Sequence, residues 1–176
     1  MIFSICRFIE RANTYLGLAA MWLVLAMVLV QFAIVVLRYV FGVGSLYMFE
    51  SVIYMHGILF MAAAAYTLAV DKHVRVDIFY GEAPPRRKAA IDLFGALFLL
   101  LPTCALVWWL GFPYVARSWA VLEGSRETSG LPAIFLLKTF ILVFAATLFA
   151  QGIVMAVRAA AHLTGRPMDD TYSAGG

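Results

Sequence analysis

The sequence predicts an all-α membrane protein with four transmembrane helices, a short N-terminal interfacial helix and both termini in the cytoplasm. Long apolar stretches occupy residues 13–37, 47–70, 89–110 and 131–157, and each can cross a hydrocarbon core of about 30 Å as a helix. Charged residues make up 13% of the chain, whereas a soluble domain is about one quarter charged. Too few residues remain outside these stretches for a second unit, so we expect one membrane domain over residues 1–176.

The first element is an amphipathic segment over residues 2–11. Ile2, Ile5, Cys6 and Ile9 share one arc of a helical wheel, and most polar residues share the other. This pattern predicts a helix that lies on the inner leaflet with its apolar arc in the acyl boundary. A simple N-terminal extension of the first span is the alternative. No small-x-small cleavage pattern follows the first span, so we expect the span to remain in the mature protein.

The first two spans contain few polar interior residues. Gln31 is the strongly polar residue of the first span, which ends at Arg38, where an arginine can snorkel to the outer interface. Gly42 and Gly44 then break the helix. The second span begins near Glu50.

In the segment between the second and third spans, the pattern of apolar residues changes from helical spacing to alternation. Residues 73–80 alternate between apolar and polar side chains, which predicts an extended or interfacial segment. Pro85 is suited to the first turn of the next helix. The third span carries Asp92, and Pro102 is expected to kink it near the middle of the membrane.

The last span follows the longest external loop. Residues 117–130 form this predicted loop, and the fourth span contains Lys138 and Gln151. After the last span, residues 158–176 form a polar, glycine-containing tail that we expect to be disordered in the cytoplasm.

The distribution of lysine and arginine predicts the orientation. Nine of the 13 basic residues fall on the two termini and the loop between the second and third spans: Arg7, Arg11, Lys72, Arg75, Arg86, Arg87, Lys88, Arg158 and Arg166. Three fall on the opposite side: Arg38, Arg117 and Arg126. Basic residues near membrane ends are retained in the cytoplasm, so both termini are predicted to lie inside.

Ionisable residues inside a span are costly unless they are paired. Glu50, Arg38 and Lys138 are all predicted in the outer half of the membrane, so we expect Glu50 to meet Lys138 or Arg38. Asp92 and Gln151 lie at a similar depth in the inner half, and we expect a hydrogen bond near them. Packing between helices is the favoured role for these groups; contact with a partner subunit and a transport site are the alternatives.

The sequence gives no support for an enzyme or for a cofactor. His56 is the single histidine within a span, whereas a haem bundle needs facing histidine pairs. No cluster of His and Cys has metal-ligand spacing, and no phosphate-binding GxxxxGK[ST] motif is present. The basic residues of the middle loop alternate with acidic ones at the membrane edge, which argues against a nucleic-acid partner.

Several short motifs follow one another in a fixed order. Arg38-Tyr39-Val40-Phe41-Gly42 precedes Glu50, and His73-Val74-Arg75-Val76-Asp77 follows the second span. The order continues with these segments: Asp92-Leu93-Phe94-Gly95, Pro102, Glu123, Gly130-Leu131-Pro132-Ala133, Lys138 and Gln151-Gly152. Over about residues 38–152 the chain resembles the small membrane subunit of tripartite ATP-independent periplasmic (TRAP) transporters, the DctQ-like family.

The resemblance implies an accessory subunit of the bacterial inner membrane. Such subunits scaffold a large multi-span permease subunit and help a periplasmic substrate-binding protein to dock, and uptake of an organic acid is driven by an ion gradient, typically of sodium. By analogy, the outer loops would face the binding protein. The structural or partner-contact candidates are Arg38, Glu50, His73, Arg75, Asp77, Asp92, Pro102, Lys138 and Gln151.

One departure from the family pattern lies at the start of the second span. Many members carry a tryptophan and two consecutive acidic residues where this chain has Tyr47-Met48-Phe49-Glu50-Ser51. A single carboxylate remains, which puts any role of the pair in doubt. Two alternatives stay open: the small subunit of a tripartite tricarboxylate-type transporter, and a four-helix membrane anchor of another complex.

Overall fold

A computed structural model describes residues 2–71, 73, 80 and 83–166, and all of its regular structure is helical. The helices are α1 (Ile2–Val40), α2 (Leu46–Ala69), α4 (Pro85–Phe94), the π-helix η1 (Gly95–Leu100), α5 (Leu101–Ala120) and α6 (Ile134–Leu163). Because α4, η1 and α5 are continuous, four helical rods are long and apolar enough to cross a membrane. The predicted fold class of four transmembrane helices is confirmed, and the described residues contain no strand.

The first rod is longer than the sequence predicts. Residues 2–11 are helical, but they continue without a break into the first span. No glycine or proline separates the two parts, so α1 runs for 39 residues, which corresponds to about 58 Å at 1.5 Å per residue. This arrangement matches the alternative of an N-terminal extension. Part of the polar arc faces the other helices, since Glu10 forms an ion pair with Arg158 of α6.

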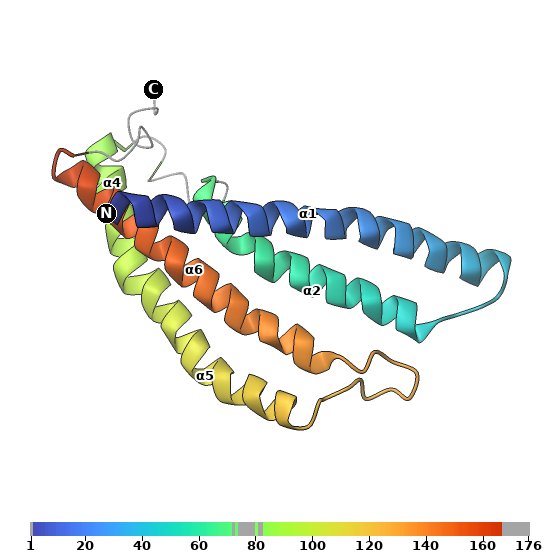
Figure 1. Ribbon diagram of the computed structural model, residues 1–176. Helices are drawn as coiled ribbons and strands as arrows, with labels where there is room; N and C mark the ends of the chain where they lie inside the picture. The colour runs from blue at the N-terminus through green and yellow to red at the C-terminus, as the bar shows by residue number, and fades with distance from the viewer. Residues whose placement is uncertain (1, 72, 74–79, 81–82, 167–176) are drawn as a thin grey trace.

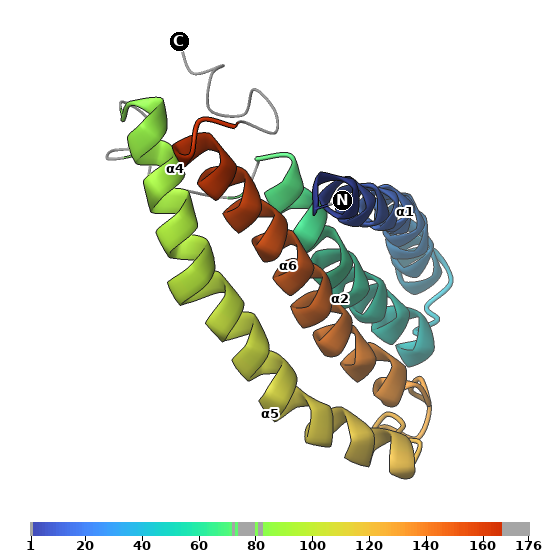
Figure 2. The same cartoon turned by 60° about the vertical axis from the view of Figure 1, so that its left-hand side comes forward.

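The third rod contains a π-helix directly before Pro102. Proline has no backbone N–H, and the backbone N–H of Leu101 bonds to the carbonyl of Ala96, five residues earlier. The predicted irregularity at Pro102 therefore takes the form of a widened turn, and Figure 2 shows the rod curving along its length. The rod also continues through Pro113 to Ala120, beyond the predicted end at residue 110. Val115 and Ser118 are buried there, so their packing keeps the segment after Pro113 helical.

Helix α6 is the centre of the assembly. It contacts α1, α2, α4, η1 and α5, while α1 and α5 lie at the two edges (Figures 1 and 2). Small residues allow the close approach: Ala65, Cys104 and Leu148 form one core cluster, and Ala89 packs on Ala159 in another. The helices therefore form an open fan around α6.

The two ends of the fan differ in shape. The start of α1 and the end of α6 lie together at one end, which we call the terminal end (Figure 1). The connections 41–45 and 121–133 lie at the other end, which we call the loop end. The helices spread apart toward the loop end, so the longest described loop sits where the fan is widest.

Candidate functional site

The loop formed by residues 121–133 is folded back onto the start of α2. The carboxylate of Glu50 accepts a hydrogen bond of 2.6 Å from Ser125 Oγ and another of 2.6 Å from the backbone N–H of Leu131. The loop is also closed on itself, because the N–H of Ser125 donates to the carbonyl of Leu131. Gly130 is packed so tightly that an added Cβ would overlap Ser125 and lie 2.7 Å from Glu50 Oε1. One carboxylate therefore holds the loop at two points, Ser125 and Leu131.

A second carboxylate fixes the same loop to α5 and α6. Glu123 accepts hydrogen bonds from Lys138 Nζ at 2.5 Å and from Ser118 Oγ at 2.7 Å. The ammonium group of Lys138 also lies 4.1 Å from the centre of the Tyr114 ring, a cation–π contact. The hydrogen bonds from Lys138 and Ser118 hold the pKa of Glu123 below its ordinary value. We call the contacts of Glu50 and Glu123 together the loop brace.

Polar contacts also join the helices at the terminal end. Asn13 Nδ2 donates to Gln151 Oε1 at 2.9 Å, and both side chains are buried. Glu10 pairs with Arg158 on the same two helices. Near this point Gly17 lies against Tyr66 of α2, where an added Cβ would come within 2.5 Å of the tyrosine side chain. These contacts hold α1 against both α6 and α2.

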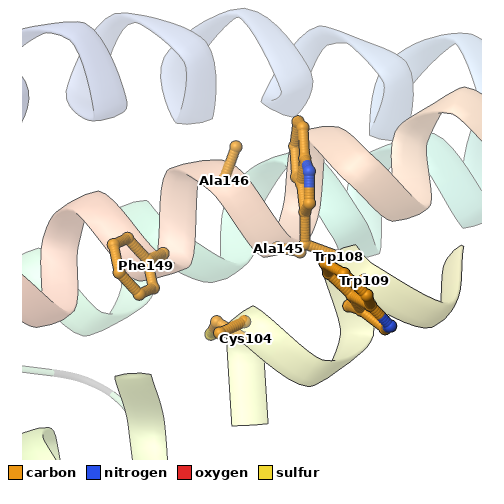
Figure 3. A pocket seen from close by; sticks show the side chains of 7 residues that line it. Cys104, Trp108, Trp109, Ala145, Ala146 and Phe149 are labelled. Carbon is orange, nitrogen blue, oxygen red and sulfur yellow. The ribbon is translucent and has the colours of Figure 1, made fainter. Parts of the chain in front are cut away.

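The groove between α5 and α6 has largely apolar walls. Its volume is about 490 Å³, and Figure 3 shows Cys104, Trp108 and Phe149 around it. Among the described residues, no group of three His, Cys, Asp or Glu side chains is placed to share a metal ion. The polar features that can support a function are therefore the loop brace and the exposed groups near it.

The comparison with protein families decides between the alternatives left by the sequence. The family model of the tripartite ATP-independent periplasmic transporters, DctQ component, matches residues 27–166. The chain belongs to the DctQ family. No curated protein and no solved structure matches the chain.

The DctQ assignment makes this chain the small permease subunit of a TRAP transporter, a transporter component and not an enzyme. It implies a tripartite system with a large permease subunit and a binding protein as partners. Glu50 and Glu123, the two carboxylates of the loop brace, lie within the matched segment.

The predicted pairing of Glu50 in this DctQ component is wrong. Glu50 bonds to the loop, and Lys138 bonds to Glu123. The reason is the path of the loop, which brings a hydroxyl and a free N–H directly over Glu50 and places Glu123 next to Lys138. Arg38 is exposed in the last turn of α1 and forms no ion pair with any described residue.

The predicted contact between Asp92 and Gln151 is also wrong. Asp92 is buried and accepts a hydrogen bond of 2.8 Å from the Tyr80 hydroxyl. Gln151 accepts its hydrogen bond from Asn13 of α1 instead. Helix α4 packs on the last turns of α6 through Ala89 and Ala159, beyond Gln151, so the two side chains are at different levels.

The remaining candidates of the DctQ component are less constrained by the structure. His73 is exposed in the bend that follows α2. Arg75 and Asp77 lie outside the described residues. Pro102 is exposed at the start of α5. Contact of His73, Arg75 and Asp77 with a partner subunit stays a prediction.

The sequence reasoning missed several residues that carry these contacts. Hydropathy places Asn13 at the edge of the first span, although Asn13, Gly17 and Ala20 recur with helical spacing and mark a packing stripe. That spacing could have revealed the stripe. Ser125 gave no comparable signal, because its role depends on how the loop folds back.

Proposed function

We propose that this DctQ component is a scaffold that widens the footprint of the large permease subunit and presents a preformed surface to the periplasmic binding protein. Uptake of an organic acid by the complete transporter would be driven by an ion gradient, typically of sodium. The family supports the subunit role. The loop brace supports the docking role.

The proposed orientation places the terminal end in the cytoplasm of a bacterial inner membrane. Arg7, Arg11, Arg86, Arg87 and Arg158 belong to the helix ends that meet at the terminal end. The loop end carries Arg38, Arg117 and Arg126. Since basic residues are retained inside, this asymmetry turns the loop end toward the periplasm.

Orientation is tested by labelling single cysteines in intact cells. Ser129→Cys lies on the exposed part of the loop and should react with an impermeant maleimide added from outside. Ser173→Cys, in the C-terminal tail, should react only after the membrane is opened. The reverse pattern would invert the proposed orientation.

The observation that supports the docking role is that Glu50 accepts hydrogen bonds from Ser125 and Leu131 of the same loop. Ser125 and Leu131 are fixed by that carboxylate, and the four residues 126–129 between them are exposed. A surface that is ordered before binding avoids the entropy cost of ordering on contact. The tip of the loop therefore has the properties of a preorganised docking surface.

Docking is tested with the reconstituted transporter and its binding protein. The double variant Arg126→Ala/Glu127→Ala changes the exposed tip and keeps every hydrogen bond of Glu50 and Glu123. It should weaken association of the binding protein by about tenfold, the effect of ~1.4 kcal/mol. Recovery of the large subunit should be unchanged. Val43→Ala, at the other exposed connection, is the control for a general surface change. Unaltered affinity in the double variant would remove this loop from the docking surface.

A further inference from the structure

Gln31, His56 and Thr103 are polar side chains in the interior of the membrane helices. All three are exposed, and none forms a side-chain hydrogen bond to another residue that the structure describes. By contrast, Thr67 and Thr147 each donate to a carbonyl of their own helix. Hydrocarbon chains offer no donor or acceptor, so an amide, an imidazole and a hydroxyl in contact with lipid would stay unsatisfied.

Gln31 and His56 lie at nearly the same depth. Helices α1 and α2 are antiparallel neighbours joined by the short connection 41–45. Gln31 is nine residues before the end of α1, and His56 is ten residues after the start of α2. At 1.5 Å per residue, both lie about 14–15 Å from the loop end of their helices.

The exposed stripe of α2 faces away from α6. Phe49, Ile53, His56 and Phe60 recur at intervals of four and three residues, and all are exposed. On a helical wheel this stripe lies opposite the buried Ala62 and Ala65, which face the other helices. The imidazole of His56 therefore points to the side of the fan that α6 does not cover.

A matching stripe runs along α1. Its residues have the same spacing and are all exposed: Val24, Val28, Gln31, Val35 and Arg38. This stripe continues the spacing of Asn13, Gly17 and Ala20, which pack on α6 and α2, into the part of α1 nearer the loop end, where its residues are exposed. Its valines are smaller than the residues of the flank behind it, which carries Trp22, Leu29 and Phe32.

Thr103 extends this face to α5. A groove of about 500 Å³ lies between α2 and α5, and Thr103 and Leu99 line it together with the small residues Gly95 and Ala96. Leu148 of α6 lines the same groove. Small residues in a groove let another helix approach closely, and π-helical turns such as η1 occur often at functional sites.

The other side of the fan is different. The groove between α5 and α6 is lined by Ala105, Trp108 and Trp109 of α5 and by Phe149 of α6, and Figure 3 labels the two tryptophans and Phe149. On a helical wheel the three α5 residues lie on the opposite flank from Thr103. These side chains are apolar apart from the indole N–H groups, and tryptophan is common at the membrane interface. The polar atoms of this side are therefore two indole N–H groups, whereas the other side carries an amide, an imidazole and a hydroxyl.

We propose that the face defined by Gln31, His56 and Thr103 is where this chain packs against transmembrane helices of the large permease subunit. That subunit would supply hydrogen-bond partners at the depth of the amide and imidazole, and again opposite the hydroxyl. The side with Trp109 and Phe149 would face lipid. This proposal rests on the proposed function, because it takes the large subunit as the occupant of the face.

Photo-crosslinking of the co-expressed transporter tests the face directly. A benzophenone amino acid replaces Ile53 or Phe60 on the proposed face, and Trp109 or Ile153 on the other side; all four positions are exposed in the isolated chain. Adducts with the large subunit should form from positions 53 and 60 and be absent from 109 and 153. The reverse pattern, or adducts of two copies of this chain from 53 and 60, would overturn the proposal.

A matched pair of bulky substitutions tests packing on α1. Val28 and Leu29 are 59% and 60% exposed, so either can become tryptophan without disturbing the chain itself. Val28→Trp should lower recovery of the large subunit, while Leu29→Trp should not. Equal recovery in both variants, or loss only in Leu29→Trp, would contradict the assignment of the face.

Removal of the polar groups tests the hydrogen bonds. The triple variant Gln31→Leu/His56→Phe/Thr103→Val should lower recovery of the large subunit roughly tenfold, since each interhelical hydrogen bond contributes modestly in a membrane. Thr67→Val, whose hydroxyl bonds within its own helix, is the control. Unchanged recovery in the triple variant would count against the face. Failure of the unsubstituted chain to co-purify with the large subunit would instead reject the proposed function.

Discussion

The buried amides of Asn13 and Gln151 are the clearest polar contact between distant residues. Each side chain is almost fully buried, and Asn13 Nδ2 donates a hydrogen bond of 2.9 Å to Gln151 Oε1. Loss of one partner leaves a buried polar group unsatisfied, which is costlier than replacement of both partners by apolar groups of similar shape. The pair therefore specifies the position of α1 on α6.

Asn13→Leu should lower the free energy of unfolding by about 1–3 kcal/mol, because Gln151 is left without its partner. The double variant Asn13→Leu/Gln151→Met should recover most of that loss. Unfolding by titration with denaturing detergent measures both. Equal destabilisation in the single and double variants would show that the hydrogen bond between the two amides does not account for the loss of stability.

Glu123 gives the loop brace a defined pH range. Its pKa is held low by the hydrogen bonds from Lys138 and Ser118. A carboxyl group with a lowered folded pKa stabilises the fold above its unfolded pKa of about 4.3, and that stabilisation is lost as the pH falls through the folded value. The brace should therefore stay intact from pH 5 to pH 8.

The carboxyl carbon of Glu123, followed by NMR, should titrate below its ordinary value of about 4.3. In Lys138→Met the pKa should rise, because the main hydrogen-bond donor is gone. Lys88→Met, far from the loop, should leave the titration unchanged. A titration of Glu123 at its ordinary pKa in the unsubstituted chain would contradict the brace.

At the scale of elements, Gly130 shows how closely the loop fits its base. An added methyl group at Gly130 would overlap Ser125 and crowd Glu50. Gly44, in the other connection, has open space around it. The two glycines therefore offer a matched comparison.

Gly130→Ala should loosen the loop, and tryptic cleavage after the exposed Arg126 should become several-fold faster, because local opening controls proteolysis. Gly44→Ala should leave the cleavage rate unchanged. The measurement is the half-life of the intact chain in detergent under limiting trypsin. Identical half-lives for the two variants would mean that the loop is not held at Gly130.

The elements differ in how far the sequence predicts them. Hydropathy locates four spans because the bilayer sets their length. It does not place their ends, since packing carries α5 through Pro113 to Ala120. The partners of Glu50 lie 75 and 81 residues away along the chain. No helical wheel relates such positions, so the pairing of Glu50 depends on the loop path and was predicted wrongly.

At the scale of the whole molecule, the chain consists of two halves joined at both ends of the fan. Helices α1 and α2 form one half, and α4, η1, α5 and α6 form the other. The Asn13–Gln151 contact joins them at the terminal end, and the contacts of Glu50 join them at the loop end. Helix α6 makes most of the remaining contacts between the halves.

Co-expressed fragments 1–76 and 77–176 should therefore associate in the membrane and co-purify. The variant Asn13→Leu/Gly130→Ala removes one join and crowds the other, so it should reduce recovery of the partner fragment. Tagged pull-down from detergent measures the ratio of the fragments. Fragments that purify separately without any substitution would show that the covalent link holds the halves together.

The hydrogen bonds of Glu50 bear on how the sequences of such subunits can differ. The carboxylate holds a hydroxyl and a main-chain amide, and it makes no demand on the side chains of residues 126–129. In the proposed docking role, substitutions at these four positions would suit a different binding protein while the membrane helices stay unchanged. A chain that carries residues 126–129 of a relative should then bind the binding protein of that relative, provided that Ser125 and Gly130 are kept.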